Sequence, residues 1–470
     1  MTNKGERFDL IVLGGGSAGY AAARTAHELG KRVAVVDGAE ELSGLCILRG
    51  CMPSKTLIYS AEVLHLAQKG NLFGFKGPQP IADLAAMQKR KREIIKEFSD
   101  YRKDQLLDGR FTLIRDHGKF IDSHTIALLG GGTLEADKFL ICTGSVIKTP
   151  NLIGLAECSY KTSDDVLGLE QLPEECVVLG GGVVACELAQ FLTRIGCRVI
   201  QLQRSSHILK EFAQESSEVV ESAMRKEGVD LRTDVSLQSF ENLGNERTLV
   251  NFEHQGQSHS LETKFLFNAL GRTPATNNLG LEKIGIKPAK SGHIPTNAHQ
   301  QTSLPNIYAA GDCAGPHEIV HIAIQQGETA AKHAFGKKVP PMKYDTLLTV
   351  VFTDPQVARV GLSCEQMKER GISPITASFP FDDHGKSILM EAKHGYVAIH
   401  ADRKTGRVYG GECVSKDAGE LIHCISIAVA LQATVEDLLK ADWYHPTLSE
   451  IWTYPLEDIA DEIADYNRQD

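Results

Sequence analysis

Two cysteines, Cys46 and Cys51, are separated by four residues within the segment Gly44–Lys55. Pro53 suits the first turn of a helix, where a missing N–H leaves no hydrogen bond unmade, so we expect a helix to begin near Cys51. A helix N-terminus favours a thiolate, and Lys55 faces the same side of that helix as Cys51. Four intervening residues let the two sulfurs meet, which predicts reversible disulfide chemistry. A purely structural disulfide is the alternative interpretation.

A glycine-rich turn shortly before these cysteines predicts a dinucleotide site. The turn Gly14-x-Gly16-x-x-Gly19 follows the apolar strand Phe8–Leu13 and opens a helix. Its glycines let the backbone approach a pyrophosphate, to which the helix N-terminus offers free N–H groups and a positive dipole end. The next strand ends at Asp37, whose carboxylate suits the hydroxyl pair of a ribose. A cysteine pair placed soon after such a turn can exchange electrons with a flavin.

The same strand–turn–helix–strand pattern occurs a second time, around Gly180 and Gly182, with a different residue at the ribose position. Gln203 stands where the first copy has its acid, and the cations Arg204 and Lys210 follow. A 2′-phosphate is repelled by an acid and held by cations. We therefore assign FAD to the first turn and NADP(H) to the second. If Arg204 and Lys210 are only solvated surface cations, NAD(H) is the alternative.

Composition narrows the class of protein. The chain has 470 residues, of which 42% are hydrophobic and 23% charged, and this length suggests about three domains of an ordinary globular protein. A net charge of -10 and 6% aromatic residues argue against nucleic-acid binding. No apolar run reaches the ~18 residues of a membrane span. The 11 scattered cysteines do not form a secreted disulfide framework, so we expect a reducing, cytoplasmic location.

Further motifs make the chain resemble a known family. They are Cys142-Thr143-Gly144-Ser145, Gly271-Arg272-Thr273-Pro274, Ala310-Gly311-Asp312, Val351–Pro355 and His445–Glu450. Together with the cysteine segment and both glycine turns, they resemble the motifs of the class I pyridine nucleotide-disulfide oxidoreductases. That family includes dihydrolipoyl dehydrogenase, glutathione reductase and mercuric reductase. The resemblance runs nearly from end to end.

The resemblance implies an α/β fold with two Rossmann-like dinucleotide-binding domains, for FAD and NAD(P), plus an α+β C-terminal dimerisation domain. Placed by motif, the FAD domain covers residues 1–149 and 276–343, with the NAD(P) domain inserted at 150–275. The interface domain covers 344–470. The resemblance also implies a homodimer that acts on a small-molecule or lipoyl-like disulfide or dithiol, without a nucleic-acid or membrane partner.

The resemblance assigns roles to the cysteines and to two nearby residues. Cys51 would be the flavin-side sulfur, and Cys46 the sulfur that attacks the substrate disulfide. Lys55 and Glu187 would pair beside the flavin and tune its electronics. Arg49 departs from the family motif, and we hypothesise that it lowers the thiolate pKa or guides an anionic substrate.

The acid–base group implied by the resemblance is His445, which would reach in from the other subunit of the dimer and be oriented by Glu450. A second interpretation competes for Glu450, because Thr447-x-x-Glu450 is also a capping box that would start the last helix. Both interpretations hold only if one carboxylate serves both partners.

The remaining implied site residues bind the cofactors. The predicted FAD contacts are Gly14, Gly16, Ser17, Ala18, Gly19, Asp37, Lys55, Thr143, Gly144, Gly311 and Asp312, and the predicted NAD(P) contacts are Gly180, Gly182, Val183, Glu187, Arg204, Lys210 and Gly271. Asp312 would hold the ribityl chain of FAD. No metal site is predicted, and the last cysteine is Cys424, so the C-terminal cysteine pair of mercuric reductase is missing.

These observations predict an FAD-dependent disulfide oxidoreductase. We expect it to pass electrons from NAD(P)H, with NADPH preferred, through the Cys46–Cys51 disulfide to a small or lipoyl-like disulfide. One alternative is an NAD-linked dihydrolipoyl dehydrogenase. Others are a flavin-only NAD(P)H oxidase or diaphorase and a redox-sensing flavoprotein.

Overall fold

The first strand–turn–helix unit forms where the sequence predicts it. The structure is a computed structural model that describes residues 7–469, and it places strand β1 at Arg7–Leu13, helix α1 at Ser17–Glu28 and strand β2 at Val33–Val36. β1 and β2 pair in parallel, as expected for strands joined by a helix. The outer ends of the first and last predicted domains, residues 1–6 and 470, lie outside the described residues.

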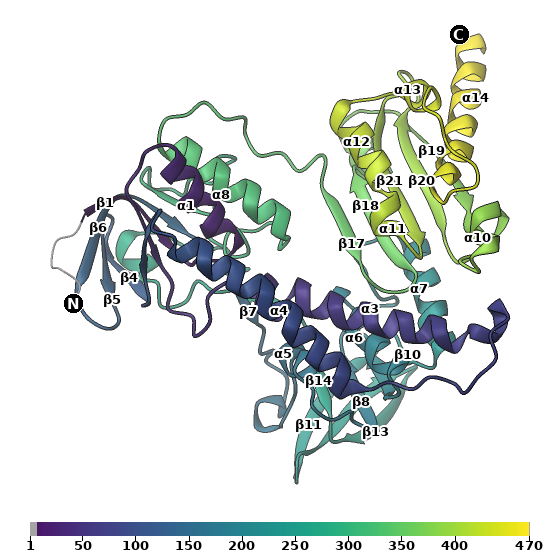
Figure 1. Cartoon of the computed structure of the whole chain (residues 1–470), viewed down its shortest axis with the longest axis horizontal. Coiled ribbons are helices and arrows are strands. Elements are labelled where there is room, and N and C mark those ends of the chain that lie inside the picture. Colours follow the sequence, from purple (N-terminus) through teal and green to yellow (C-terminus); the bar gives the residue numbers. More distant parts are fainter. Residues whose placement is uncertain (1–6, 470) are drawn as a thin grey trace.

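Seven strands form the first sheet, in the order β3-β2-β1-β6-β5-β4 with β16 paired to β6. The added strands are β3 (Thr112–Ile114), β4 (Gly118–Asp122), β5 (Thr125–Leu128), β6 (Thr133–Ile141) and β16 (Ile307–Ala309). β16 shows that the chain returns to this sheet late in the sequence. Helices α1 and α8 (Val320–Ala334) pack side by side on one face (Figure 1), where Gly327 meets the Ala18 carbonyl and leaves no room for a Cβ.

The second glycine turn belongs to a parallel four-stranded sheet, in the order β10-β9-β8-β14. Its elements are β8 (Glu175–Leu179), α6 (Val183–Arg194), β9 (Arg198–Leu202), α7 (Gln214–Glu227), β10 (Asp230–Arg232) and β14 (Leu266–Asn268). An antiparallel sheet of β11 (Ser236–Gly244), β12 (Arg247–His254) and β13 (Gln257–Thr263) shares an apolar core with it. A short ribbon of β7 (Ser145–Ile147) and β15 (Arg272–Pro274) connects the first two units.

The last unit is built on an antiparallel sheet in the order β17-β18-β21-β20-β19. Its strands are β17 (Leu348–Val351), β18 (Gln356–Gly361), β19 (Pro374–Pro380), β20 (Tyr396–Asp402) and β21 (Val408–Ser415). Its helices are α9 (Cys364–Glu369), α10 (Gly385–Leu389), α11 (Ala418–Leu421), α12 (His423–Leu431), α13 (Val435–Leu439) and α14 (Thr453–Gln469). The fully buried Trp452 anchors the start of α14 to this core.

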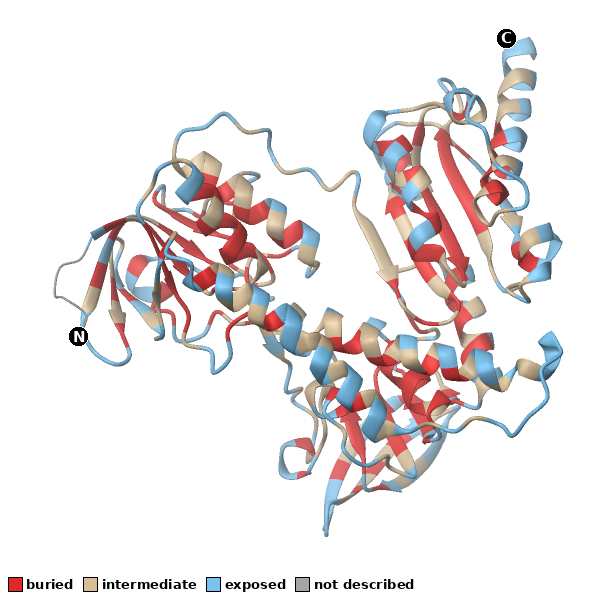
Figure 2. Cartoon of the chain, in the orientation of Figure 1, coloured by how far each residue is buried: buried red, intermediate tan, exposed pale blue. Residues whose placement is uncertain are grey.

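The cysteine segment lies at the junction of the three units. It forms a short helix, α2 (Leu45–Arg49), followed by α3 (Cys51–Gln68), and α4 (Leu84–Leu107) packs against α3. The buried Leu57, Ala61 and Leu64 of α3 join the core of the second sheet, which also includes residues of the last unit. Figure 1 shows α3 and α4 crossing the molecule beside the second sheet, and Figure 2 shows buried residues concentrated in the central strands of the first, second and last sheets.

This architecture confirms the predicted fold class: two dinucleotide-binding units and a C-terminal α+β unit. The predicted domain limits are compatible with these sheets and remain a prediction. Within residues 7–469, no helix is long and apolar enough to cross a lipid bilayer.

Candidate active site

The two cysteines of the motif lie together at the start of α3. Cys46 is in α2, and Cys51 is the first residue of α3, so the residues between them form a short helix and not an open loop. The Cys46 and Cys51 thiols are within hydrogen-bonding range of each other, and both are free thiols in this structure. Neither side chain is in the core, so the pair is accessible from outside the chain.

The two thiols of this pair differ in pKa. The pKa of Cys51 is lowered to about 7, because it accepts a hydrogen bond from the Cys46 thiol and because the Lys55 ammonium lies nearby, while burial opposes the shift. The same hydrogen bond, together with burial, raises the pKa of Cys46. In the reduced pair, Cys51 is therefore the thiolate and Cys46 keeps the proton. The side chain of Arg49 is 53% exposed and lies 3.9 Å from Asp164, which makes Lys55 the cation that acts on Cys51.

Lys55 and Glu187 form the predicted pair. The Lys55 Nζ lies 2.8 Å from Glu187 Oε2 and 4.7 Å from the centroid of the Phe352 ring. The other carboxylate oxygen of Glu187 accepts the Phe352 N–H at 2.9 Å, and only 3% of the Glu187 side chain is exposed. Both oxygens of this buried carboxylate are thus used, which fixes the position of the ammonium beside Cys51.

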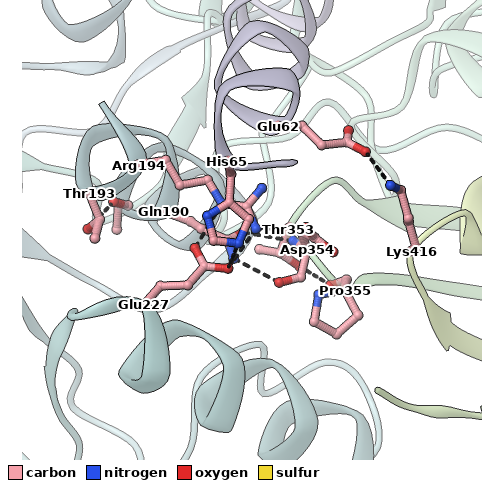
Figure 3. A network of polar contacts seen from close by, with 11 residues as sticks. Glu62, His65, Gln190, Thr193, Arg194, Glu227, Thr353, Asp354, Pro355 and Lys416 are labelled. Carbon is pink, nitrogen blue, oxygen red and sulfur yellow. Dashed lines mark hydrogen bonds and ion pairs between the residues drawn. The ribbon is translucent and has the colours of Figure 1, made fainter. Parts of the chain in front are cut away.

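A second polar network, which the sequence analysis missed, lies one and two turns further along α6 (Figure 3). The Gln190 amide donates to the Asp354 carbonyl at 2.8 Å and accepts the Asp354 N–H at 2.7 Å. Arg194 donates to Glu227 at 2.6 Å and to the Asp354 carboxylate at 2.7 Å. These bonds tie α6, α7 and the loop after Phe352 together. The sequence signal for this network is a set of polar residues, Glu187, Gln190 and Arg194, at helical spacing in the otherwise apolar helix α6.

The first glycine turn has the shape of a phosphate cradle. A Cβ on Gly19 would collide with the Gly14 carbonyl, and Gly16 at the N-cap of α1 offers no side-chain acceptor, so the first N–H groups of the helix stay open to a ligand. The buried Asp37 accepts the Gly15 N–H at 2.7 Å. Gly16 also lies against Gly44, just before the cysteines. The turn, with Ser17 and Ala18 as the first residues of α1, therefore fits the pyrophosphate and ribose of FAD.

The ends of β6 and β16 bring the other predicted FAD residues together. Ser145 donates its hydroxyl proton to the Asp312 carboxylate at 2.7 Å, and Arg272 donates to that hydroxyl at 2.8 Å. Thr143 donates to the Ala275 carbonyl at 2.7 Å. The adjoining residues are Gly144, at positive φ, and Gly311, whose N–H bonds to Gln326. Ser145 and Arg272 stand in the quoted motifs, but we did not predict them as site residues.

The second glycine turn opens into a cleft of about 850 Å³. The predicted NAD(P) residues that line it are Gly180, Gly182, Val183, Arg204, Lys210 and Gly271. Glu187, the remaining predicted residue, is not among the lining residues and pairs with Lys55. Arg204 and Lys210 are exposed, as a phosphate site requires, and Gln203 is buried. Asp234 and Glu318 also line the cleft. Burial raises the pKa of Glu318, and the nearby charge of Asp312 raises it further. The cleft therefore extends to the predicted FAD site.

The predicted histidine–glutamate pair is formed. The His445 Nδ1 lies 3.0 Å from both oxygens of the Glu450 carboxylate, and 78% of the His445 side chain is exposed. Thr447 accepts the Glu450 N–H at 3.3 Å, so the backbone half of the expected capping box exists while the carboxylate serves His445. The loop between α13 and α14 that carries His445 lies in the last unit, well away from the start of α3 (Figure 1).

A second histidine that we did not predict touches the same carboxylate. His384 precedes α10 and is fully buried. Its Nε2 lies 3.4 Å from Glu450 Oε1, and its Nδ1 lies 2.8 Å from the Ser387 hydroxyl. No spacing in the sequence connects His384 with Glu450, because β20 and β21 intervene between them.

Two dinucleotide sites that converge near a cysteine pair are the parts of an enzyme that moves electrons between a nicotinamide and a disulfide. The chain belongs to the pyridine nucleotide-disulphide oxidoreductase family: the family model matches residues 8–327, and the model of the family's dimerisation domain matches residues 347–455. It is therefore an oxidoreductase and a flavoprotein, and members of this family use FAD and NAD(P)H. FAD supplies, when bound, a two-electron carrier between NAD(P)H and the cysteine pair.

Relatives with two different names are similar to this chain over nearly its whole length. A mercuric reductase from Staphylococcus aureus is 32% identical over 449 residues, covering 95% of this chain and 82% of the relative. A dihydrolipoyl dehydrogenase from Chlamydia muridarum is 30% identical over 452 residues, covering 95% and 96%. The crystal structure of LpdA from Mycobacterium tuberculosis superposes with a TM-score of 0.86 at 28% identity, covering 97% and 99%.

Proposed function

We propose that this enzyme uses NADPH to reduce a small or lipoyl-like disulfide through Cys51 and Cys46, as a homodimer. The observation that carries this proposal is the shared proton of the cysteine pair, with a Cys51 pKa of about 7 and the Cys46 pKa raised. A pair in this state has a thiolate on Cys51, the proposed flavin-side sulfur, and a protonated thiol on Cys46, the proposed attacking sulfur, which is what two successive exchange steps need.

The chemistry at the sulfurs balances without a further reactant. His445 of the partner subunit takes the Cys46 proton, and the Cys46 thiolate attacks one sulfur of the substrate, forming a mixed disulfide. The leaving thiolate receives that proton and becomes the first thiol, which departs from a linear disulfide and stays tethered in an opened lipoyl-like ring. The Cys51 thiolate then attacks the Cys46 sulfur, which releases the second sulfur of the substrate as a thiolate, protonated by water, and re-forms the Cys46–Cys51 disulfide.

The preference for NADPH is supported by the charges along the nucleotide cleft. Arg204 and Lys210 line it and are exposed, and the residue in the ribose position is Gln203. Two further cations, Lys148 and Arg272, and three acids, Glu211, Asp234 and Glu318, also line the cleft, so cations outnumber acids there by four to three. An NAD-linked dihydrolipoyl dehydrogenase is the alternative that a preference for NADH would favour.

The dimer is supported by the place of His445. Its side chain is largely exposed, and the loop that carries it lies away from the start of α3 of the same chain (Figure 1), so we propose that the second subunit completes the site. Apolar side chains of α3, namely Tyr59, Val63 and Leu66, are also exposed and available to a second copy. We also propose the domain limits 1–149 with 276–343, 150–275 and 344–470, which are compatible with the separate sheets of the three units.

The variant Cys46→Ser tests the proposal. It should abolish reduction of oxidised lipoamide, glutathione disulfide and coenzyme A disulfide, each assayed with NADPH and NADH, while NADPH-dependent quinone reduction survives. Unchanged disulfide turnover would instead favour a flavin-only oxidase or diaphorase. Failure of NADPH to bleach the flavin of the unmodified enzyme would favour a redox-sensing flavoprotein.

A further inference from the structure

We propose that His384 is a positioning residue for the acid–base step, which orients Glu450 and weakens the hold of this carboxylate on the His445 proton. The inference rests on the proposed role of His445 and deepens it. It starts from an arrangement in which one buried carboxylate contacts two imidazoles, His445 at 3.0 Å and His384 at 3.4 Å.

The polar group close to the His384 Nε2 is the Glu450 carboxylate. His384 is fully buried between η4 (Phe381–Asp383) and α10, with the edges of the Phe381 and Tyr454 rings around it. Within the described residues, its Nε2 makes no close hydrogen bond, and it is within ion-pair range of Glu450 Oε1.

His384 stays neutral at physiological pH. Burial lowers its pKa, the Glu450 carboxylate opposes this shift, and the charge of His445 adds to it. Its neighbours along the chain are Asp382 and Asp383, which are exposed, and Lys386, which is half-buried, so solvent screens their charges. A neutral imidazole carries one N–H.

The tautomer of His384 follows from its two neighbours. The Ser387 hydroxyl, 2.8 Å from Nδ1, is able to donate its proton. The Glu450 carboxylate only accepts, so a bare Nε2 facing it would be repelled. The favoured state therefore has Ser387 donating to Nδ1, with the ring proton on Nε2, which lies 3.4 Å from Glu450 Oε1.

This N–H affects His445 through the carboxylate. A carboxylate that already interacts with one N–H has less negative charge available to stabilise a second, protonated imidazole. His445 therefore gives up its proton more readily than it would beside a carboxylate without His384. The same contact restrains the Glu450 side chain, and with it the ring of a histidine that is largely exposed.

The test compares two variants with a matched control. His384→Leu removes the donor and should move the pH midpoint of NADPH-dependent disulfide reduction upward by about 0.5–1 pH unit. His384→Gln keeps an N–H donor and should shift the midpoint less. His400→Gln, at another buried histidine of the same unit that has no contact with Glu450, should leave it unchanged.

A second readout does not depend on the substrate. The enzyme is reduced with dithionite without oxygen, and the rate of Cys46 alkylation by iodoacetamide is followed against pH. The midpoint of this rate should move in the same direction in His384→Leu, whereas the rate of flavin reduction by NADPH should not change. Thermal unfolding confirms that each variant is folded, and His384→Gln supplies the test if His384→Leu does not fold.

Two different failures are distinguishable. If both His384 variants are folded and keep the pH midpoints of the unmodified enzyme, the inference about His384 is overturned while the disulfide chemistry stands. If Cys46→Ser leaves disulfide reduction intact, the proposed function fails before any question about His384 arises. The positioning role is also contradicted if the His384 variants lose turnover rate only as much as His400→Gln does and neither pH midpoint shifts.

Discussion

Charge within a few ångströms decides which sulfur of the pair is ionised. The Cys46 hydrogen bond and the Lys55 ammonium together bring the pKa of Cys51 to about 7, against the effect of burial. Because this pKa is lowered, the thiolate is present above it and is lost as the pH falls through about 7. Glu187 holds Lys55 in place, so the ionisation of a sulfur on α3 depends on a side chain of α6.

Removing the Lys55 charge should therefore change the titration of Cys51. In Lys55→Met we expect the pKa of Cys51 to rise by about one unit, since a cation near the thiolate is lost. The measurement is a pH titration of the long-wavelength absorbance of the two-electron-reduced enzyme. Lys55→Arg, which keeps the charge, should shift it less, and Arg49→Leu should not shift it. An equal shift in Lys55→Met and Arg49→Leu would contradict the assignment of Lys55 as the cation that acts on Cys51.

The cations of the nucleotide cleft make a prediction about cofactor choice. Replacing Arg204 and Lys210 together by Gln removes the two charge-assisted contacts that we propose for a 2′-phosphate, and we expect the KM for NADPH to rise about tenfold or more. The KM for NADH, which has no such phosphate, is the internal control and should change little. If both KM values rise equally, these residues act on the fold of the cleft and not on the phosphate.

Among individual residues, those whose role depends on neighbours within one motif were predictable from the sequence. Cys51, Lys55 and the glycine turns are specified by their neighbours in the chain, so their geometry follows from one turn or one helix. His384 and Arg194 function through contacts with residues far away in the sequence. Such contacts are created by packing of separate units, and no local spacing reports them.

Among the elements, α6 links the chemistry to the architecture. It presents Glu187, Gln190 and Arg194 to α3, α7 and the loop at residues 352–355. Figure 3 shows the contacts of Gln190 and Arg194. Only 4% of the Arg194 side chain is exposed. Because a buried cation is stable only when it is paired, this helix side is a structural joint as well as part of the site.

Breaking this joint should destabilise the protein. Arg194→Met keeps most of the length of the side chain but leaves Glu227 and Asp354 without their cation, and we expect a loss of about 3 kcal/mol in the free energy of unfolding. Urea unfolding followed by circular dichroism measures it. Arg247→Gln, which breaks a solvent-exposed pair with Glu262, serves as the control and should have little effect. Equal losses in both variants would contradict the account.

The elements themselves were predictable where their pattern was long enough. The two strand–turn–helix units and the strands around them have apolar runs that parallel, fully buried strands require. The prediction missed α2, because five residues contain too little periodicity to separate a helical turn from a loop.

For the whole molecule, the central question is whether one site uses two chains. The exposed His445 pairs with the buried Glu450 in the last unit, and the cysteines lie at the junction of the three units. A dimer with two-fold symmetry would build two such sites, each with sulfurs from one subunit and an imidazole from the other.

Mixing two inactive variants tests this arrangement. Cys46→Ser and His445→Gln homodimers should each lack disulfide reduction. In a hybrid dimer, one site carries both changes and the other carries neither, so an equal mixture that exchanges subunits freely should recover about a quarter of the full activity. No recovery, with subunit exchange confirmed by native mass spectrometry, would place His445 and Cys46 of the same chain in one site.

The relay through Cys51 is tested most directly by the absorbance of enzyme reduced anaerobically with one equivalent of dithionite. We predict a long-wavelength thiolate-to-flavin band in the unmodified enzyme that fades as the pH falls through about 7. The band should be present in Cys46→Ser even before reduction, and absent from Cys51→Ser at every stage. A band that survives in Cys51→Ser, or that never forms in the unmodified enzyme, would contradict the account.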